Sequence, residues 1–83
     1  MSLTKEMKAR RAKELLEDDV FLEAVAQVKE GLVEQWSQTK PSDTETRENL
    51  YYRDRGLDEI LTQLRILIYD WNVQKQRKNK TRT

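Results

Sequence analysis

Two clusters of basic side chains, one at each end of the chain, are the most chemically distinctive feature of this sequence. The last nine residues, KQRKNKTRT, hold five Lys or Arg and no acidic or apolar side chain, and residues 1–13 hold five more bases against Glu6. Ammonium and guanidinium groups bind phosphates and carboxylates. The candidate contacts to nucleic-acid phosphates or to an acidic partner are Lys8, Arg10, Arg11, Lys13, Lys75, Arg77, Lys78, Lys80 and Arg82.

The formal net charge of +1 conceals this division. Residues 1–13 carry +4, residues 74–83 carry +5 and residues 14–73 carry −8. A fold that brings the two basic clusters together favours an anionic partner, because like charges repel. The alternative is that the terminal bases are only solvated and complement a helix dipole.

Side chains for catalysis are scarce. There is no His and no Cys, so Ser-His-Asp and Cys-His nucleophile systems are excluded. The acid pairs Asp18–Asp19 and Asp58–Glu59 are sequence neighbours, which point about 100° apart on a helix and do not converge on one metal or one substrate. Only an oligomer could build a carboxylate metal site from them. The sequence therefore predicts a protein that is not an enzyme, with no cofactor, no metal site and no small-molecule substrate.

Composition indicates a small helical protein that depends on association. The chain has 83 residues, of which 36% are hydrophobic and 37% charged, so a core of its own is marginal. No apolar run is long enough to span a membrane, and residues 1–16 lack the apolar segment of a secretory signal. We expect a soluble intracellular protein with no membrane partner.

The elements that position these groups are helices, because the chain has two Gly, one Pro and almost no strand-like alternation. Pro41 ends a helix before residue 39, and the next helix begins with Ser42–Glu45 as a capping box or with Asp43 as an equally good N-cap. Asp18 is the N-cap expected at a second, weaker break. The prediction is one domain, 1–83.

Within this domain we expect helices at about 3–17, 19–38 and 43–76. Residues 1–17 form a basic N-terminal arm, and residues 19–76 form an antiparallel hairpin with its turn at 39–43. Residues 77–83 are a disordered basic tail. The fold class is all-α, a helical hairpin preceded by a short N-terminal helix, and oligomeric or partner-bound.

Apolar stripes predict how the hairpin packs. On the long helix Leu50 begins a coiled-coil-like heptad, with Ile60 and Leu67 at its intervening positions and Leu61 and Ile68 widening it. The expected packing or oligomer interface comprises Phe21, Val25, Val28, Leu32, Trp36, Leu50, Leu57, Ile60, Leu61, Leu64, Leu67, Ile68 and Trp71. Tyr51, Tyr52 and Tyr69 lie off this line and form a candidate partner surface. Gly31 and Gly56 would face each other, either at a close helix crossing or as two tolerated glycines.

Residues 11–67 resemble small helical proteins encoded in tailed-bacteriophage and prophage genomes. The resemblance rests on Arg11-Ala12, on the Leu-Leu-Glu-Asp-Asp segment at 15–19, on an apolar helix, on Thr-Lys-Pro-Ser-Asp at 39–43, and on a second leucine helix. Asp19 departs from the pattern, which often has Pro after the cap. The resemblance implies a phage origin, a role near head assembly, DNA packaging or the virion, and a location in the host cytoplasm during infection or in the particle.

Three functions follow as hypotheses. The first is a non-enzymatic phage assembly, virion-associated or adaptor protein that binds itself or a large phage structural protein through helix–helix contacts. Its basic termini would then touch an acidic partner or DNA. The second is a nucleic-acid-binding accessory or regulatory protein that uses non-specific phosphate contacts. The third is a host-directed inhibitor that presents the acidic residues 14–73.

Overall fold

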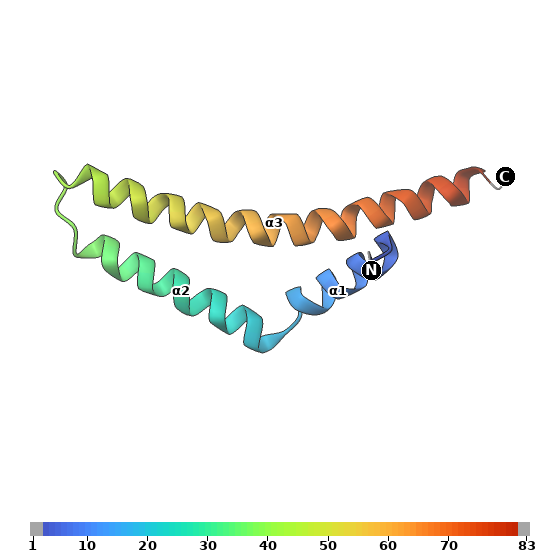
Figure 1. The fold of residues 1–83 in the computed structure, drawn as a ribbon, viewed down its shortest axis with the longest axis horizontal. Helices are drawn as coiled ribbons and strands as arrows, with labels where there is room; N and C mark the ends of the chain where they lie inside the picture. Colours follow the sequence, from blue (N-terminus) through green and yellow to red (C-terminus); the bar gives the residue numbers. More distant parts are fainter. Residues whose placement is uncertain (1–2, 82–83) are drawn as a thin grey trace.

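The computed structural model describes the backbone of residues 3–81 and the side chains of residues 3–77. This part of the chain forms three helices and no strand: α1 (Lys5–Leu16), α2 (Asp19–Ser37) and α3 (Thr44–Thr81). The all-helical class is confirmed. The molecule is a rod of 62 × 25 × 24 Å, and α3 runs along its full length (Figure 1).

Short polar side chains begin each helix. Asp18 Oδ1 accepts a hydrogen bond from the backbone N–H of Phe21 at 2.8 Å, as expected for the N-cap of α2. Thr4 caps α1 in the same way, accepting from Met7 N at 3.1 Å. At the start of α3, Asp43 Oδ1 accepts from Thr46 N at 3.3 Å. Of the two alternatives at this position, Asp43 is therefore the cap.

A tight turn joins α2 to α3. Trp36 O and Lys40 O accept hydrogen bonds from the N–H groups of Thr39 and Asp43, so the chain reverses over residues 37–43. Pro41 lies inside this turn, where its fixed φ and missing N–H cost nothing. The end of α2 at Ser37 agrees with the helix stop predicted from Pro41.

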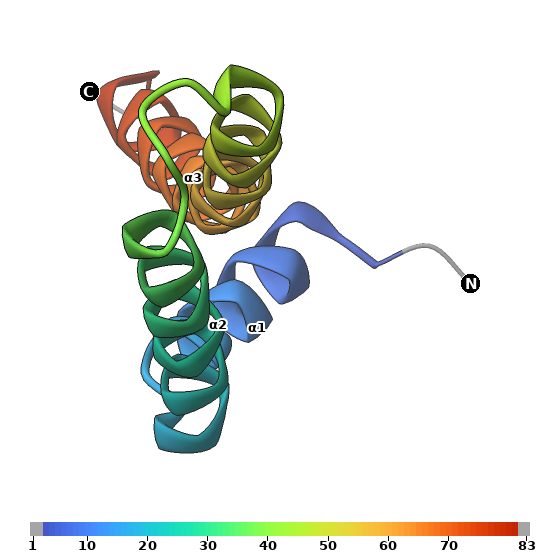
Figure 2. The same ribbon diagram turned by 90° about the vertical axis from the view of Figure 1, so that its left-hand side faces the viewer.

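The two shorter helices form a bent pair along one side of α3. Figure 1 shows α2 beside the first half of α3 near the turn and diverging from it toward residue 19, whereas α1 lies beside the second half. Figure 2 shows both on the same side of the long helix. α1 packs mainly on α3 and contacts α2 little. The bend at residues 17–18 is thus the point of the chain that stands furthest from α3.

The long helix continues beyond its predicted end. α3 reaches Thr81, so residues 77–81 of the predicted disordered tail are helical, and residues 82–83 lie outside the described residues. At about 1.5 Å per residue, the 38 residues of α3 extend about 57 Å. The last turns carry the C-terminal basic cluster away from the turn between α2 and α3.

The core is very small. Among the described side chains, only Ala9, Ala12, Leu32 and Leu50 are buried. Leu32 and Leu50 lie near the turn, where α2 meets α3, and the two alanines lie on α1, which packs on α3. Small side chains let one helix approach another closely, so α1 docks through alanine rather than through a leucine stripe.

The other helices of the chain cover only part of the heptad stripe predicted on α3. Leu57, Leu61, Leu64 and Ile68 are half-buried, whereas Ile60 is 57% exposed and Leu67 is 36% exposed. Leu61 and Ile68 therefore fill the inner seam, and Ile60 and Leu67 lie outside it. The two series are adjacent and share a seven-residue spacing, so periodicity alone cannot separate them.

Close helix crossing does not explain the glycines. A Cβ atom built at Gly31 or at Gly56 meets nothing within 4 Å, so neither position requires glycine for contact within the chain. Of the two alternatives, the close crossing is wrong for this chain. A Cβ atom at either position would meet open space.

Candidate functional site

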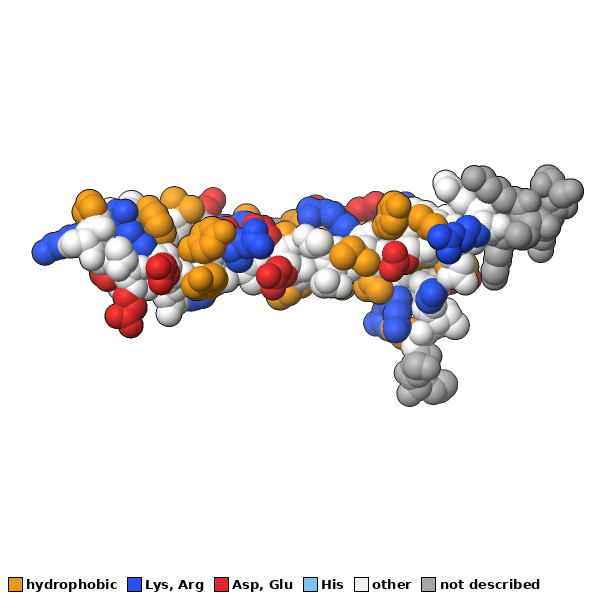
Figure 3. All heavy atoms as spheres, turned by 90° about the horizontal axis from the view of Figure 1, so that it is seen from above, with side chains coloured by type: hydrophobic (Ala, Val, Ile, Leu, Met, Phe, Trp, Pro, Cys, Tyr) orange, Lys and Arg blue, Asp and Glu red, His pale blue; other side chains and the backbone are white. Residues whose placement is uncertain are grey.

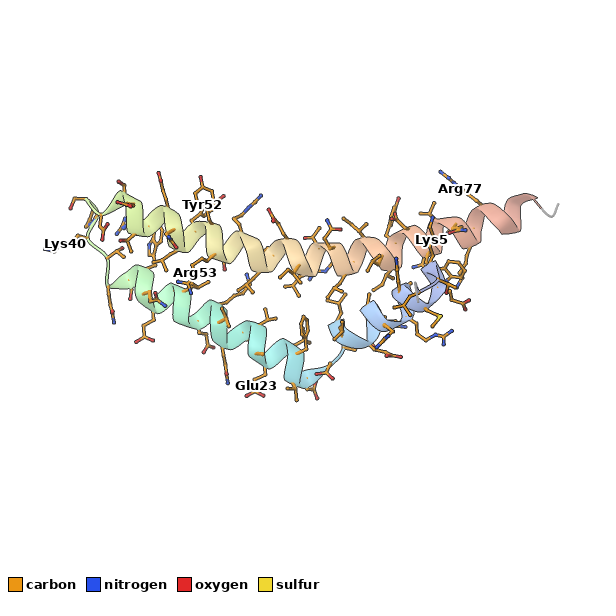
Figure 4. The ribbon with its side chains drawn as sticks, viewed as in Figure 1. Lys5, Glu23, Lys40, Tyr52, Arg53 and Arg77 are labelled. Atoms are coloured by element: carbon orange, nitrogen blue, oxygen red, sulfur yellow. The ribbon has the colours of Figure 1, made fainter. Side chains whose placement is uncertain are left out.

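Aromatic side chains gather at the end of the rod that holds the turn. We call Trp36, Tyr51 and Tyr52 the loop-end aromatic patch. The guanidinium carbon of Arg47 lies 4.9 Å from the centroid of the Trp36 ring, and the Tyr51 and Tyr52 rings meet edge to face at 5.7 Å. Both geometries are attractive because an aromatic ring has a negative face and a positive edge. The patch is exposed, and Figure 4 shows Tyr52 pointing away from α2.

Hydrogen bonds fix Arg47 in this arrangement. Its Nε donates to Thr39 Oγ1 at 2.8 Å, and that hydroxyl donates in turn to the carbonyl of Trp36 at 2.6 Å. The start of α3 is thereby tied to the end of α2. Two shallow hollows flank Trp36 and Tyr51: one continues to Val33 and Asp54, and the other to Pro41 and Glu48. The loop end thus offers aromatic rings with carboxylates beside them.

An ion cluster joins the two helices further along. Lys29 Nζ donates to Asp58 at 2.7 Å and to Asp54 at 3.2 Å. These hydrogen bonds raise the pKa of Lys29 above its ordinary value of 10.5, first through Asp58 and then through Asp54. The ammonium group is thus charged at every physiological pH. Because charged side chains occupy this part of the inner face, α2 and α3 have no continuous apolar seam here.

Basic side chains meet at the opposite end of the rod. Lys5 of α1 and Arg77 of α3 line one hollow together with Tyr69, and Figure 4 shows both bases at this end. Lys75 Nζ lies 5.8 Å from the Trp71 ring, a cation–π contact. We call the bases of residues 5–13 and 75–77 the basic end. The fold therefore brings Lys5 of the N-terminal cluster to the same hollow as Arg77 of the C-terminal one.

The predicted interface residues divide by burial. Leu32 and Leu50 are buried, and the half-buried members are Phe21, Val25, Leu57, Leu61, Leu64, Ile68 and Trp71. Val28, Trp36, Ile60 and Leu67 are exposed, as are Tyr51, Tyr52 and Tyr69. The predicted contacts Lys8, Arg10, Arg11, Lys13, Lys75 and Arg77 are exposed on α1 and α3. The side chains of Lys78, Lys80 and Arg82 lie outside the described residues.

The outer face of α3, turned away from α1 and α2, carries hydrophobic side chains between charged ones along the rod (Figure 3). Ile60 and Leu67, which we call the outer stripe, are seven residues apart and lie on one side of the helix, at the flank of the inner seam and about 100° from Leu61 and Ile68. Residue types that normally pack into a coiled coil are thus left uncovered within the chain.

Sequence reasoning did not single out two features of this surface. The first is Ala9 and Ala12, whose three-residue spacing in a basic helix signals a small-residue contact face. The second is the cluster of Lys29 with Asp54 and Asp58. The sequence feature that could have predicted this cluster is a lysine within the apolar stripe of the second helix, together with two acidic residues spaced four apart on the third helix.

Comparison with known proteins gives no family. No protein-family model, no curated protein and no solved structure matches this chain. Within residues 3–81, no helix is long and apolar enough to cross a membrane. In the same residues, no group of three or more acidic side chains is arranged to hold a metal ion.

Proposed function

We propose that this chain is a non-enzymatic assembly or adaptor protein that acts through helix–helix contacts with itself or with a larger structural protein. The observation that carries the proposal is the imbalance between core and exposed apolar surface. Among the described residues four side chains are buried, whereas thirteen large hydrophobic side chains are exposed. Exposed apolar patches mark protein contacts, because covering them removes apolar area from water.

The outer stripe is the best-placed part of this surface. Ile60 is 57% exposed and Leu67 is 36% exposed, and the two lie on one side of the long helix α3. Coiled-coil partners bind helices of this pattern in the same manner. The resemblance of residues 11–67 to phage-encoded helical proteins supports a structural protein of a tailed phage as the partner.

Closure of the antiparallel hairpin belongs to the same proposal. α2 and α3 touch near the turn and diverge toward residue 19, which leaves Phe21 and Leu64 only half-buried. Association can complete their burial by pressing α2 onto α3. Spin labels at positions 21 and 64 should then report a shorter distance in the assembly than in the free chain.

The test is affinity capture from the cells that produce the protein. The wild-type chain should retain itself or structural proteins after a high-salt wash, and the double variant Ile60→Glu, Leu67→Glu should lose them. Thr62→Glu is the matched control, because Thr62 is exposed on α3 about 200° around the helix from Ile60 and the change adds the same kind of charge. Identical partners and identical mass for the wild type and the double variant would overturn the proposal.

Nucleic-acid binding is the second candidate, favoured by the convergence of Lys5 and Arg77 on one hollow. Phosphate contacts release counterions, so the affinity for duplex DNA should fall steeply with salt and show little sequence preference. Filter binding at two salt concentrations measures this dependence. Truncation after Gln74 should weaken binding to all sequences alike, and an unchanged affinity would exclude the role of the basic end.

A further inference from the structure

We infer that one flank of the α2–α3 pair is a face through which two copies of this chain associate. The inference rests on the proposed function and deepens it, because it names both the contact surface and the partner. We call this surface the uncharged flank, and it includes the outer stripe. Its residues on α2 are Val20, Ala24, Gln27, Val28, Gly31 and Gln35. Its residues on α3 are Asn49, Arg53, Gly56, Ile60, Gln63 and Leu67.

Helical geometry and the surface hollows place these residues on one flank. Each residue of a helix is turned about 100° from the one before, so residues three, four and seven apart share a side. Gln35 of α2 lines one hollow together with Asn49 and Arg53 of α3, and Figure 4 shows Arg53 extending toward α2. Val33 and Tyr51, which are about 200° around their helices from Gln35 and Arg53, line a different hollow. The groove between α2 and α3 therefore has two flanks.

The two flanks differ in charge. Among the twelve residues of the uncharged flank only Arg53 is charged, although 37% of the chain is Asp, Glu, Lys or Arg. The opposite flank of the same helices carries Lys29, Arg47, Asp58 and Arg65. Depletion of charged residues other than Arg distinguishes the core of a protein interface from the rest of the surface. Composition therefore marks the uncharged flank as a contact face.

Apolar side chains and backbone on this flank are left uncovered within the chain. Val28 is 48% exposed and Ile60 is 57% exposed, and Leu57 of the adjoining inner seam is half-buried. Glycine destabilises a helix relative to alanine, yet a Cβ atom at Gly31 or Gly56 meets nothing within 4 Å. A neighbouring helix can approach the backbone closely at both positions, which gives these glycines a role that packing within the chain does not.

The lack of charge selects a second copy as the occupant. A two-fold contact sets a surface against itself, so charged groups near the axis meet their own kind and repel. An amide group can pair with its own kind because it carries both donors and acceptors, and the flank offers Gln27, Gln35, Asn49 and Gln63. A partner with several charges on its contact face would bury most of them here without counter-charges, which is costly.

The flank has the size that a dimer needs. Residues 49–67 of α3 extend about 27 Å, and the rod measures 25 × 24 Å across, so the flank presents roughly 650 Å² in projection. Stable interfaces bury about 800 Å² of accessible surface per partner, and the accessible surface of packed side chains exceeds its projection. Most of the flank lies along the first half of α3, whereas α1 lies beside the second half (Figure 1).

A matched pair of alanines on α2 tests the face. Ala24 lies on the uncharged flank and Ala26 about 200° around the helix from it, and both are exposed. Ala24→Glu should weaken dimerisation about tenfold or more, because a two-fold contact buries the new charge twice. Ala26→Glu adds the same charge to the same helix and should change the dimerisation constant less than about twofold. Sedimentation equilibrium of the full chain measures both.

Thiol reactivity maps the face independently. The chain contains no cysteine, so Gln35→Cys and Val33→Cys each place a single thiol at an exposed position, the first on the uncharged flank and the second on the opposite one. As the protein concentration rises through the dimerisation range, a maleimide should react more slowly at position 35 and at an unchanged rate at position 33. In the Ala24→Glu background, the rate at position 35 should no longer depend on concentration.

The outcomes separate the inference from the proposed function. Dimerisation that Ala24→Glu weakens and Ala26→Glu preserves, with protection at position 35, supports the dimer. Equal effects of the two alanine changes, or protection at position 33 instead, overturn the uncharged flank as the face. A strict monomer at all concentrations overturns the second copy as occupant. In either of these cases, retention of other proteins by the wild type but not by the double variant Ile60→Glu, Leu67→Glu still supports the proposed function.

Discussion

The two ends of the rod are held together in different ways. At the loop end, α2 and α3 share two buried leucines, a fixed arginine on Trp36 and an ion cluster. At the basic end, α1 docks on α3 through two buried alanines, and the bases of both helices gather there. The loop end joins segments that are adjacent in the chain, so it loses little loop-closure entropy. The basic end joins residues more than sixty positions apart.

This difference indicates a division of roles. The loop end has specific, directional contacts and is the better-anchored part of the molecule. At the basic end, small side chains allow α1 to contact α3 closely. The repulsion among the positive charges gathered there weakens this contact. An anionic group that bound there would relieve this repulsion. Four changes sharpen the comparison, in order of decreasing expected effect.

Truncation of the loop-end core should have the largest effect. Leu50 is 4% exposed, so Leu50→Ala leaves a cavity and should lower the free energy of unfolding by about 2–5 kcal/mol. Denaturation followed by circular dichroism at fixed protein concentration measures it. Thr62→Ala, an exposed change on the same helix, should stay within about 0.5 kcal/mol. Equal effects of the two changes would mean that Leu50 is not a core residue.

Overpacking of the basic end should have the next largest effect. Ala12 is 2% exposed, and Ala12→Leu should cost about 1–3 kcal/mol and push α1 off α3. Hydrogen exchange should then rise in α1 and remain unchanged around the turn. Ala26→Leu, at an exposed position of α2, is the control and should leave α1 protected. Protection of α1 in the Ala12→Leu variant would contradict the docking through alanine.

Removal of a helix cap should have a smaller effect. Asp43 Oδ1 accepts from Thr46 N, so Asp43→Ala should destabilise by about 0.5–2 kcal/mol. Ser42→Ala should be close to neutral, because Asp43 rather than Ser42 caps α3. Thermal unfolding of the two variants side by side distinguishes them. A larger loss from Ser42→Ala would restore the capping box as the helix start.

The ion cluster should have the smallest effect and a pH dependence of known sign. The raised pKa of Lys29 means that its contribution to stability is fully present below the unfolded pKa of about 10.4 and is lost as pH rises through the folded pKa, above 10.5. Lys29→Met should remove this dependence. Unfolding curves of both proteins from neutral to strongly alkaline pH measure the difference between them. Parallel curves across that range would show that the cluster does not stabilise the fold.

Much of the local structure could be predicted from the sequence. Asp18, Asp43 and Pro41 act through hydrogen bonds and steric effects within a few residues, so they fix where helices begin and end without reference to the rest of the chain. The end of α3 was less predictable, since nothing in residues 77–81 breaks a helix and only their charge argued for a tail.

The sequence by itself determined three helices, the cap at Asp18, the helix stop before Pro41, the apolar stripes and the separation of charge, because each depends on local periodicity or composition. The tertiary structure decided which stripe lies inside, that Lys29 faces Asp54 and Asp58, and that α1 returns to α3 through Ala9 and Ala12. Two neighbouring stripes have the same seven-residue spacing, so periodicity alone does not decide which of them is buried. The stripe that another helix covers is the buried one. That covering is a long-range contact, and its energy depends on the partner rather than on the pattern.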